Sequence, residues 1–79
     1  MSSNLKQDIS IGKNLQKYRK LAHFTQEQVS AQLETRGLPI SADILAKMEQ
    51  GKYSIRISVL AALKEIYRVD SYDAFFEGI

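Results

Sequence analysis

The side chains that most often perform catalysis or bind metals are few in this chain and are not grouped. The chain has no cysteine and a single histidine, His23, which excludes a disulfide framework, a thiolate zinc site and a histidine-rich metal site. Its four glycines form no phosphate-binding cluster, and no nucleophile motif is present. We therefore expect no enzyme activity, no catalytic residue, no metal or other cofactor and no small-molecule substrate.

Basic side chains, which bind polyanions, are concentrated near the N-terminus. Residues 1–24 contain five lysines and arginines and one acid, whereas residues 70–79 contain three acids and no base. The chain as a whole has a net charge of +2. A basic front and an acidic back would suit a protein with one surface on nucleic acid. The same charges are typical of an ordinary solvated surface, and charge alone favours that interpretation.

These side chains must be positioned by one small domain. A chain of 79 residues with 44% hydrophobic residues is long enough for a single core. Apolar residues recur at helical spacing and no strand-length alternation is present, so we predict an all-α domain over residues 9–79 after a flexible N-terminus, residues 1–8. The longest apolar run, Val59–Leu63, is too short to cross a membrane. We expect a cytoplasmic protein without membrane contact.

Capping residues mark where the helices begin and end. Thr25 followed by Gln28 is a capping-box signal, and Ser41 is a second N-cap. Gly37, with a proline two residues later, and Gly51 are C-terminal stop signals. We therefore predict helices over residues 9–22, 26–36, 42–50 and from 57 to about 67, with a fifth short helix that begins after residue 70 or 71.

Each predicted helix has an apolar stripe that we expect to be buried. The stripes, in chain order, are Ile11, Leu15, Tyr18 and Ala22; Val29 and Leu33; Leu45 and Met48; and Ile57, Leu60, Leu63 and Tyr67. The last segment contains Tyr72, Phe75 and Phe76, of which we expect Phe75 to close the core. The second and third helices, joined by a turn that contains glycine, are a helix-turn-helix candidate. Many small helical bundles contain such a pair, so geometry alone leaves DNA binding and an ordinary helical domain equally open.

Five short motifs occur in order along the chain: Ile11-Gly12-Lys13, Tyr18-Arg19-Lys20, Phe24-Thr25-Gln26-Glu27-Gln28-Val29-Ser30, Ile40-Ser41 and Met48-Glu49-Gln50-Gly51-Lys52. Together they resemble the XRE family, which includes the lambda-repressor-like and Cro-like DNA-binding domains of bacteria and phages. The resemblance covers residues 9–76 and implies a compact five-helix, lambda-repressor-like fold. The interval from Thr25 to Glu49 is longer than in most members, because extra residues fall around 34–38 and lengthen the turn between the two helices.

The resemblance also implies how the domain would bind double-stranded DNA. The helix over residues 42–50 would lie in the major groove, with Ala42, Asp43, Ile44 and Lys47 at the base edges. Asp43 has a second interpretation, because an acid in the first turn of a helix is favoured by the helix dipole without any DNA. Lys47 is equally explained as a solvated surface lysine.

Phosphate contacts follow from the same resemblance, and they need only hydrogen-bond donors in the right region. The matching positions are Thr25, Gln26, Lys52, Ser54 and Arg56. Each of these side chains could instead be a cap or an ordinary surface group. The resemblance further implies a partly buried structural ion pair between Arg19 and Glu49, a geometry that suits the planar guanidinium of arginine.

Two functions remain open on these grounds. The first is a sequence-specific DNA-binding domain, as in a bacterial or phage transcriptional regulator. The second is a protein-interaction adaptor or antitoxin-like module on the same scaffold, which the sparse hydrogen-bonding groups at residues 42–44 would suit. A homodimer through the C-terminal segment, with Tyr72, Phe76 and Ile79 at the interface, would let paired domains bind two half-sites; alternatively, these aromatic residues close the core of the monomer.

Overall fold

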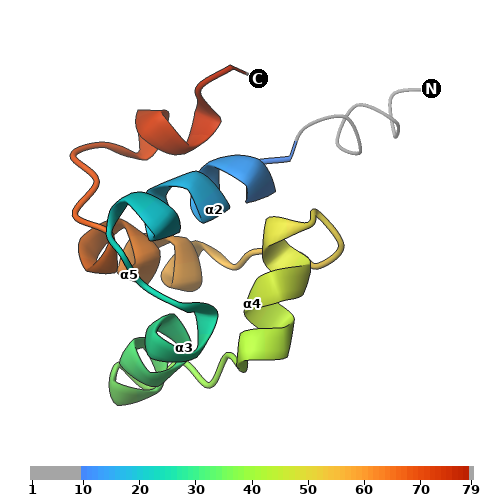
Figure 1. The fold of residues 1–79 in the computed structure, drawn as a ribbon, viewed down its shortest axis with the longest axis vertical. Helices are drawn as coiled ribbons and strands as arrows, with labels where there is room; N and C mark the ends of the chain where they lie inside the picture. Colours follow the sequence, from blue (N-terminus) through green and yellow to red (C-terminus); the bar gives the residue numbers. More distant parts are fainter. Residues whose placement is uncertain (1–9, 79) are drawn as a thin grey trace.

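The computed structural model describes residues 10–78, which form four α-helices and one 3-10 helix. The elements are α2 (Gly12–Leu21), α3 (Gln26–Thr35), α4 (Ala42–Glu49), α5 (Ile57–Ile66) and η2 (Tyr72–Phe76) (Figure 1). The described residues contain no strand, so the all-α prediction is confirmed for them. The predicted flexible segment, residues 1–8, and Ile79 lie outside the described residues.

The prediction of five α-helices is wrong for this part of the chain, because the last helical segment forms a 3-10 helix. Its hydrogen bonds join residues three apart, from the amide of Ala74 to the carbonyl of Ser71 and from the amide of Glu77 to the carbonyl of Ala74. Five residues provide little more than one turn, and short helical pieces of this kind favour the tighter 3-10 geometry.

The predicted N-caps of α3 and α4 are present. The Thr25 hydroxyl accepts a hydrogen bond from the Gln28 amide at 3.1 Å, and the Gln28 side chain accepts one from the Thr25 amide at 2.8 Å. This reciprocal pair is the capping box. The Ser41 hydroxyl likewise accepts from the Ile44 amide at 3.1 Å and caps α4. These local bonds satisfy backbone donors that a helix start leaves unpaired.

All four α-helices end in the same motif, a left-handed residue followed by a backbone hydrogen bond to the carbonyl five residues earlier. The left-handed residues are His23, Gly37, Gly51 and Arg68, with φ of 64°, 77°, 77° and 57°. The bond from the Leu38 amide to the Leu33 carbonyl, 3.0 Å, is the example at the end of α3. Gly37 and Gly51 were predicted from the sequence, whereas His23 and Arg68 were not, because a non-glycine residue is disfavoured in this conformation.

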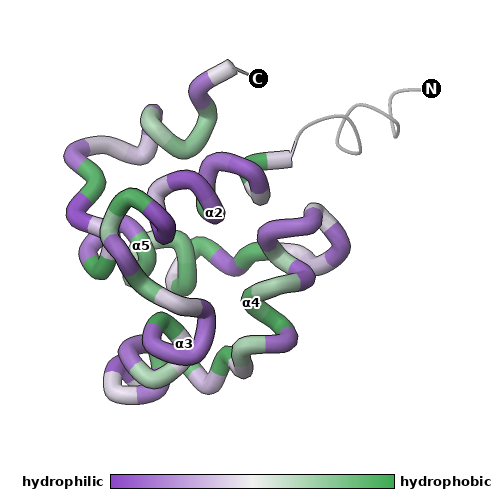
Figure 2. The backbone as a smooth tube through the Cα atoms, viewed as in Figure 1, coloured by the Kyte–Doolittle hydropathy of each residue, from purple (hydrophilic) through white to green (hydrophobic). Residues whose placement is uncertain are grey.

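The core is a single cluster to which every element contributes. Fully buried side chains come from all five: Leu15, Val29, Leu33, Leu45, Met48, Val59, Leu63 and Phe75. The expected burial of the stripes on α3 and α4 is thereby confirmed. Much of α2 is hydrophilic (Figure 2), although Leu21 at its end is an exposed hydrophobic residue. Helix α4 packs between α2 and α3, and α3 also packs on α5.

The buried face of α5 matches the predicted one in part. Leu63 and Tyr67 are buried as expected and Leu60 packs against the core, whereas Ile57 is 81% exposed. The buried residues of the helix itself are Val59, Ala62, Leu63 and Ile66. The segment has apolar residues on nearly all sides, so its periodicity does not select one face. The position of the neighbouring helices selects it instead.

Candidate nucleic-acid interface

The C-terminal end of α4 is anchored by an ion pair that the rest of the domain encloses. The Arg19 Nε donates to Glu49 Oε2 at 2.7 Å and its Nη2 donates to Oε1 at 3.2 Å. The two side chains are only 9% and 2% exposed. The guanidinium therefore binds the carboxylate with two parallel hydrogen bonds, the strongest geometry available to this pair.

Further hydrogen bonds tie the same ion pair to α3 and to the connection before it. The Gln26 side-chain amide donates to Glu49 Oε1 at 3.0 Å, and Arg19 Nη1 donates to the Phe24 carbonyl at 2.9 Å. The hydrogen bonds that Arg19 donates to the Glu49 carboxylate raise the pKa of Arg19 above its ordinary value, against the opposing effect of burial. One carboxylate thus joins α2, α3 and α4.

Gly12 allows α2 to approach the last turn of α4 closely. A Cβ atom at this position would lie 2.7 Å from the Met48 carbonyl oxygen and closer still to that of Glu49. These oxygens belong to the backbone and cannot swing aside. In the sequence Gly12 is only one member of a motif, and its packing role is visible only in the fold. Together with Glu49, it holds the C-terminal end of α4 against α2.

The N-terminal end of α4 is anchored separately, on α3. The Ser30 hydroxyl donates to the Ile40 carbonyl at 2.6 Å, and Ile40 directly precedes the N-cap Ser41. Ile40 itself packs against the core. Both ends of the eight-residue α4 are therefore attached to the rest of the domain.

The four predicted base-facing residues do not share one environment. Asp43 and Lys47 are exposed and, four residues apart, lie on the same face of α4. Ala42 is half-buried. Ile44 is half-buried too, packs against the core and lines a small pocket with Met48 and Val59. The structure therefore groups Asp43 with Lys47 and turns Ile44 towards the interior.

Sequence reasoning missed Gln50 as a member of this outer face. Gln50 is the C-cap of α4, is exposed, and follows Lys47 by three residues. The spacing of Asp43, Lys47 and Gln50, four and then three residues, was the signal that could have found it. We call these three residues the outer face of α4.

The predicted phosphate-binding residues lie at both ends of the helix pair. Thr25 is exposed at the start of α3, where its hydroxyl serves as the cap, and Gln26 is half-buried with its side chain hydrogen-bonded to Glu49. The helix start leaves backbone amides available for an anion. Lys52, Ser54 and Arg56 are all exposed in the connection after α4.

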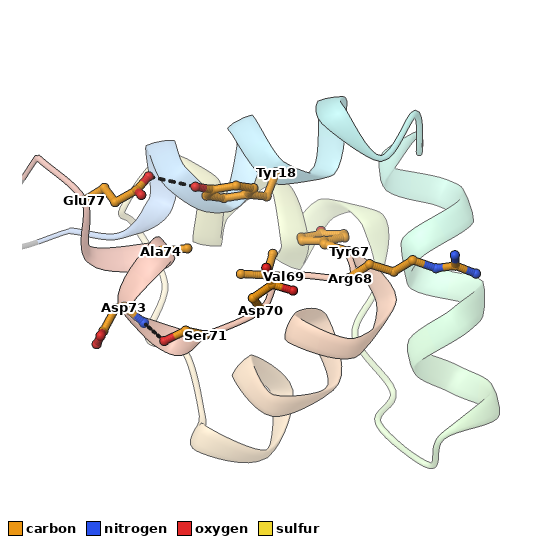
Figure 3. A pocket seen from close by; sticks show the side chains of 9 residues that line it. All are labelled: Tyr18, Tyr67, Arg68, Val69, Asp70, Ser71, Asp73, Ala74 and Glu77. Atoms are coloured by element: carbon orange, nitrogen blue, oxygen red, sulfur yellow. Dashed lines mark hydrogen bonds between the residues drawn. The ribbon is translucent and has the colours of Figure 1, made fainter.

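A pocket of about 490 Å³ lies elsewhere, between α2, the connection after α5, and η2 (Figure 3). Tyr18 and Glu77 point towards one another at its edge, where the hydroxyl donates to Glu77 Oε1 at 2.7 Å. This hydrogen bond raises the pKa of Tyr18. The Asn14 side chain also donates to the carbonyls of Phe75 and Glu77, so these bonds fasten the C-terminal segment onto α2. None of the candidate interface residues lines this pocket.

The C-terminal aromatic residues divide between the core and the surface. Phe75 is fully buried and meets Tyr18 edge to face, with ring centroids 5.9 Å apart. Tyr72 and Phe76 are 42% and 47% exposed. Phe75 thus closes the core of the single chain, while Tyr72 and Phe76 remain accessible. The homodimer stays a prediction, and Ile79, its third expected contact, lies outside the described residues.

The geometry of residues 10–78 gives two further results. No three His, Cys, Asp or Glu side chains in this part of the chain lie close enough together to hold a metal ion. None of its helices has the length and apolar character that crossing a membrane requires.

No family model, curated protein or solved structure matched the chain in three separate comparisons.

Proposed function

We propose that this chain is a sequence-specific double-stranded DNA-binding domain, of the kind found in bacterial or phage transcriptional regulators. In this proposal α3 and α4 form a helix-turn-helix and α4 enters the major groove. The observation that carries the proposal is the presentation of α4. Its inner face is buried, its two ends are held by Ser30 and Arg19, and its outer face is exposed.

The outer face has side chains that can distinguish base pairs. Lys47 can donate to the O6 and N7 atoms of guanine, and Gln50 can bind adenine through its amide. Asp43 can accept from the N4 amino group of cytosine. Asp43 also stabilises the start of α4 through the helix dipole. Its negative charge would lower the affinity for DNA, even where the side chain distinguishes one base from another.

Phosphate binding would come from the residues on either side of α4. Lys52 and Arg56 are exposed cations in the connection that follows the helix, and the start of α3 offers free backbone amides. Such contacts would position the domain on the duplex and provide most of its affinity. In this arrangement the basic side chains bind the phosphates, and the outer face of α4 contacts the bases.

A protein-interaction adaptor on the same scaffold is the second candidate. It is favoured by one observation, the half-buried positions of Ala42 and Ile44, which leave only three polar side chains on the outer face of α4. An adaptor would use that face, or the exposed Tyr72 and Phe76, for a protein partner. It would not bind DNA in a salt-dependent way.

Selection from a pool of random duplexes, followed by salt titration, separates the two candidates. We expect the selected duplex to bind with an affinity that falls steeply as salt rises, because bound cations displace counterions. Lys52→Ala should weaken binding to all duplexes and reduce the salt slope by about one. Lys47→Ala should instead lower the preference for the selected sequence.

Lys64→Ala is the matched control. Lys64 is also a cationic residue on a helix, but it lies 5.4 Å above the Tyr72 ring and away from α4. Its loss should leave both the affinity and the salt slope unchanged. Failure of the pool to yield any salt-dependent duplex binding at low ionic strength would refute DNA binding and leave the adaptor.

A further inference from the structure

The connection between α3 and α4, residues 36–41, is ordered by hydrogen bonds of its own. The Leu38 amide donates to the Leu33 carbonyl at 3.0 Å, and the Ile40 amide donates to the Leu38 carbonyl at 2.8 Å across Pro39. Leu38 and Ile40 both pack against the core. The residues of this connection therefore follow a defined path.

Ser30 attaches the end of that path to α3. Its hydroxyl donates to the Ile40 carbonyl at 2.6 Å, although the two residues are ten positions apart. Ile40 is followed immediately by Ser41, whose side chain caps α4. The contact therefore lies one residue before the helix begins and fixes the point from which α4 starts.

The two anchors of α4 act on different parts of its outer face. Glu49, at the C-terminal end, is held by Arg19 and Gln26. With a rise of about 1.5 Å per residue, the eight residues of α4 span about 12 Å. Loss of the Ser30 contact would pivot the helix about its C-terminal anchor. The first turn, which contains Asp43, would then move most and Gln50 least.

We propose that Ser30 is a positioning residue for base reading, which sets the angle of α4 through the Ile40 carbonyl without touching DNA itself. This inference rests on the proposed function. It assigns a definite role to the connection between α3 and α4, which is to fix the first turn of α4 relative to α3. The position of Asp43 relative to the bases then depends on the Ser30 hydroxyl, which belongs to α3.

The test compares Ser30→Ala, which removes the hydroxyl, with Ser30→Thr, which keeps it. Thr35→Ala is the matched control, because the Thr35 hydroxyl lies on the same helix and donates to Gln32 within α3. Each full-length variant is measured against a duplex selected by the wild type and against a shuffled duplex of equal length. Amide NMR shifts of residues 40–50 are recorded without DNA at a temperature where every variant is folded.

We expect Ser30→Ala to reduce the ratio of selected to shuffled affinity about tenfold, comparable to one mismatched base pair. Its affinity for the shuffled duplex should stay within about twofold, because phosphate contacts are kept. Shift changes should be larger in residues 41–45 than in 47–50. Ser30→Thr should restore the ratio, and Thr35→Ala should leave it unchanged. Loss of stability alone would not separate the two duplexes.

The outcomes distinguish this inference from the function on which it rests. If the wild type selects a duplex but Ser30→Ala keeps the same ratio, or Ser30→Thr fails to restore it, the positioning role is refuted and DNA binding stands. If the amide shifts of residues 41–45 do not change in Ser30→Ala, the role is refuted as well. If the wild type binds no duplex, both the proposed function and the inference fail.

Discussion

Glu49→Gln should strongly destabilise the domain, although glutamine has nearly the same size and shape as glutamate. The Glu49 carboxylate accepts three hydrogen bonds, two from Arg19 and one from Gln26. Glutamine keeps the size of the side chain but replaces one acceptor with an amino group, which would face a donor. The substitution also leaves the Arg19 guanidinium without a counter-ion at a site where its side chain is 9% exposed.

The size of the effect follows from this burial. Removing one partner of a buried ion pair costs about 3–5 kcal/mol. A chain of 79 residues has a total unfolding free energy of roughly 4–12 kcal/mol. For a domain of this size each kcal/mol lowers the thermal midpoint by about 4 °C or more, so we expect a decrease of at least about 12 °C. Circular dichroism at 222 nm during heating measures it.

Glu65→Gln is the control, because it removes the same charge from an exposed pair. Arg36 Nη1 lies 2.6 Å from Glu65 Oε1, but the two side chains are 37% and 69% exposed. Such a pair contributes about 0–1 kcal/mol and is weakened by salt. Equal midpoint decreases for Glu49→Gln and Glu65→Gln would refute the claim that burial, rather than the short contact, makes the Arg19 pair important.

Three further substitutions test the packing of the domain through the free energy of unfolding in urea. Gly12→Ala should lower it by about 1–3 kcal/mol, because the new methyl group meets the backbone of α4; an unchanged value would show that the helices separate at no cost. Arg68→Gly should raise it by roughly 0.5–1 kcal/mol by relieving the left-handed conformation, and a decrease would contradict this. Tyr67→Phe should raise it by about 1 kcal/mol, since the buried hydroxyl has no hydrogen-bond partner among the described residues. Burial raises the pKa of Tyr67 above its ordinary value of 10.0, so the titration of this hydroxyl does not affect the free energy of unfolding below pH 10 and lowers it as the pH rises further. The phenylalanine variant should therefore lose less stability above pH 10, and an equal loss in both proteins would contradict the effect.

The helix boundaries were largely readable from the sequence because their causes are local. The caps of α3 and α4 join side chains to amides three residues away, and Gly37 and Gly51 adopt backbone angles that few other residues tolerate. His23 and Arg68 end helices in the same conformation without a sequence signal. At those positions the rest of the fold outweighs the local preference.

The candidate site was readable in its residue types but not in its geometry. The sequence resemblance suggested Asp43 and Lys47 as neighbours on α4, and it also suggested the pair of Arg19 with Glu49. It did not reveal that Ile44 turns inward or that Gln26 donates to Glu49. Those facts depend on where α2 and α3 lie around α4, and the spacing of residues along a single helix does not determine this.

Sequence alone therefore determined which segments are helical, where most of them start and stop, and which face of α3 and α4 is buried. Tertiary structure alone decided that Ile57 faces solvent, that Gly12 meets the last turn of α4, and that Ser30 holds the Ile40 carbonyl. The physical reason is the distance along the chain over which each effect acts. Capping and periodicity act over one or two helical turns, whereas burial and long-range hydrogen bonds require partners from distant parts of the chain to be assembled first.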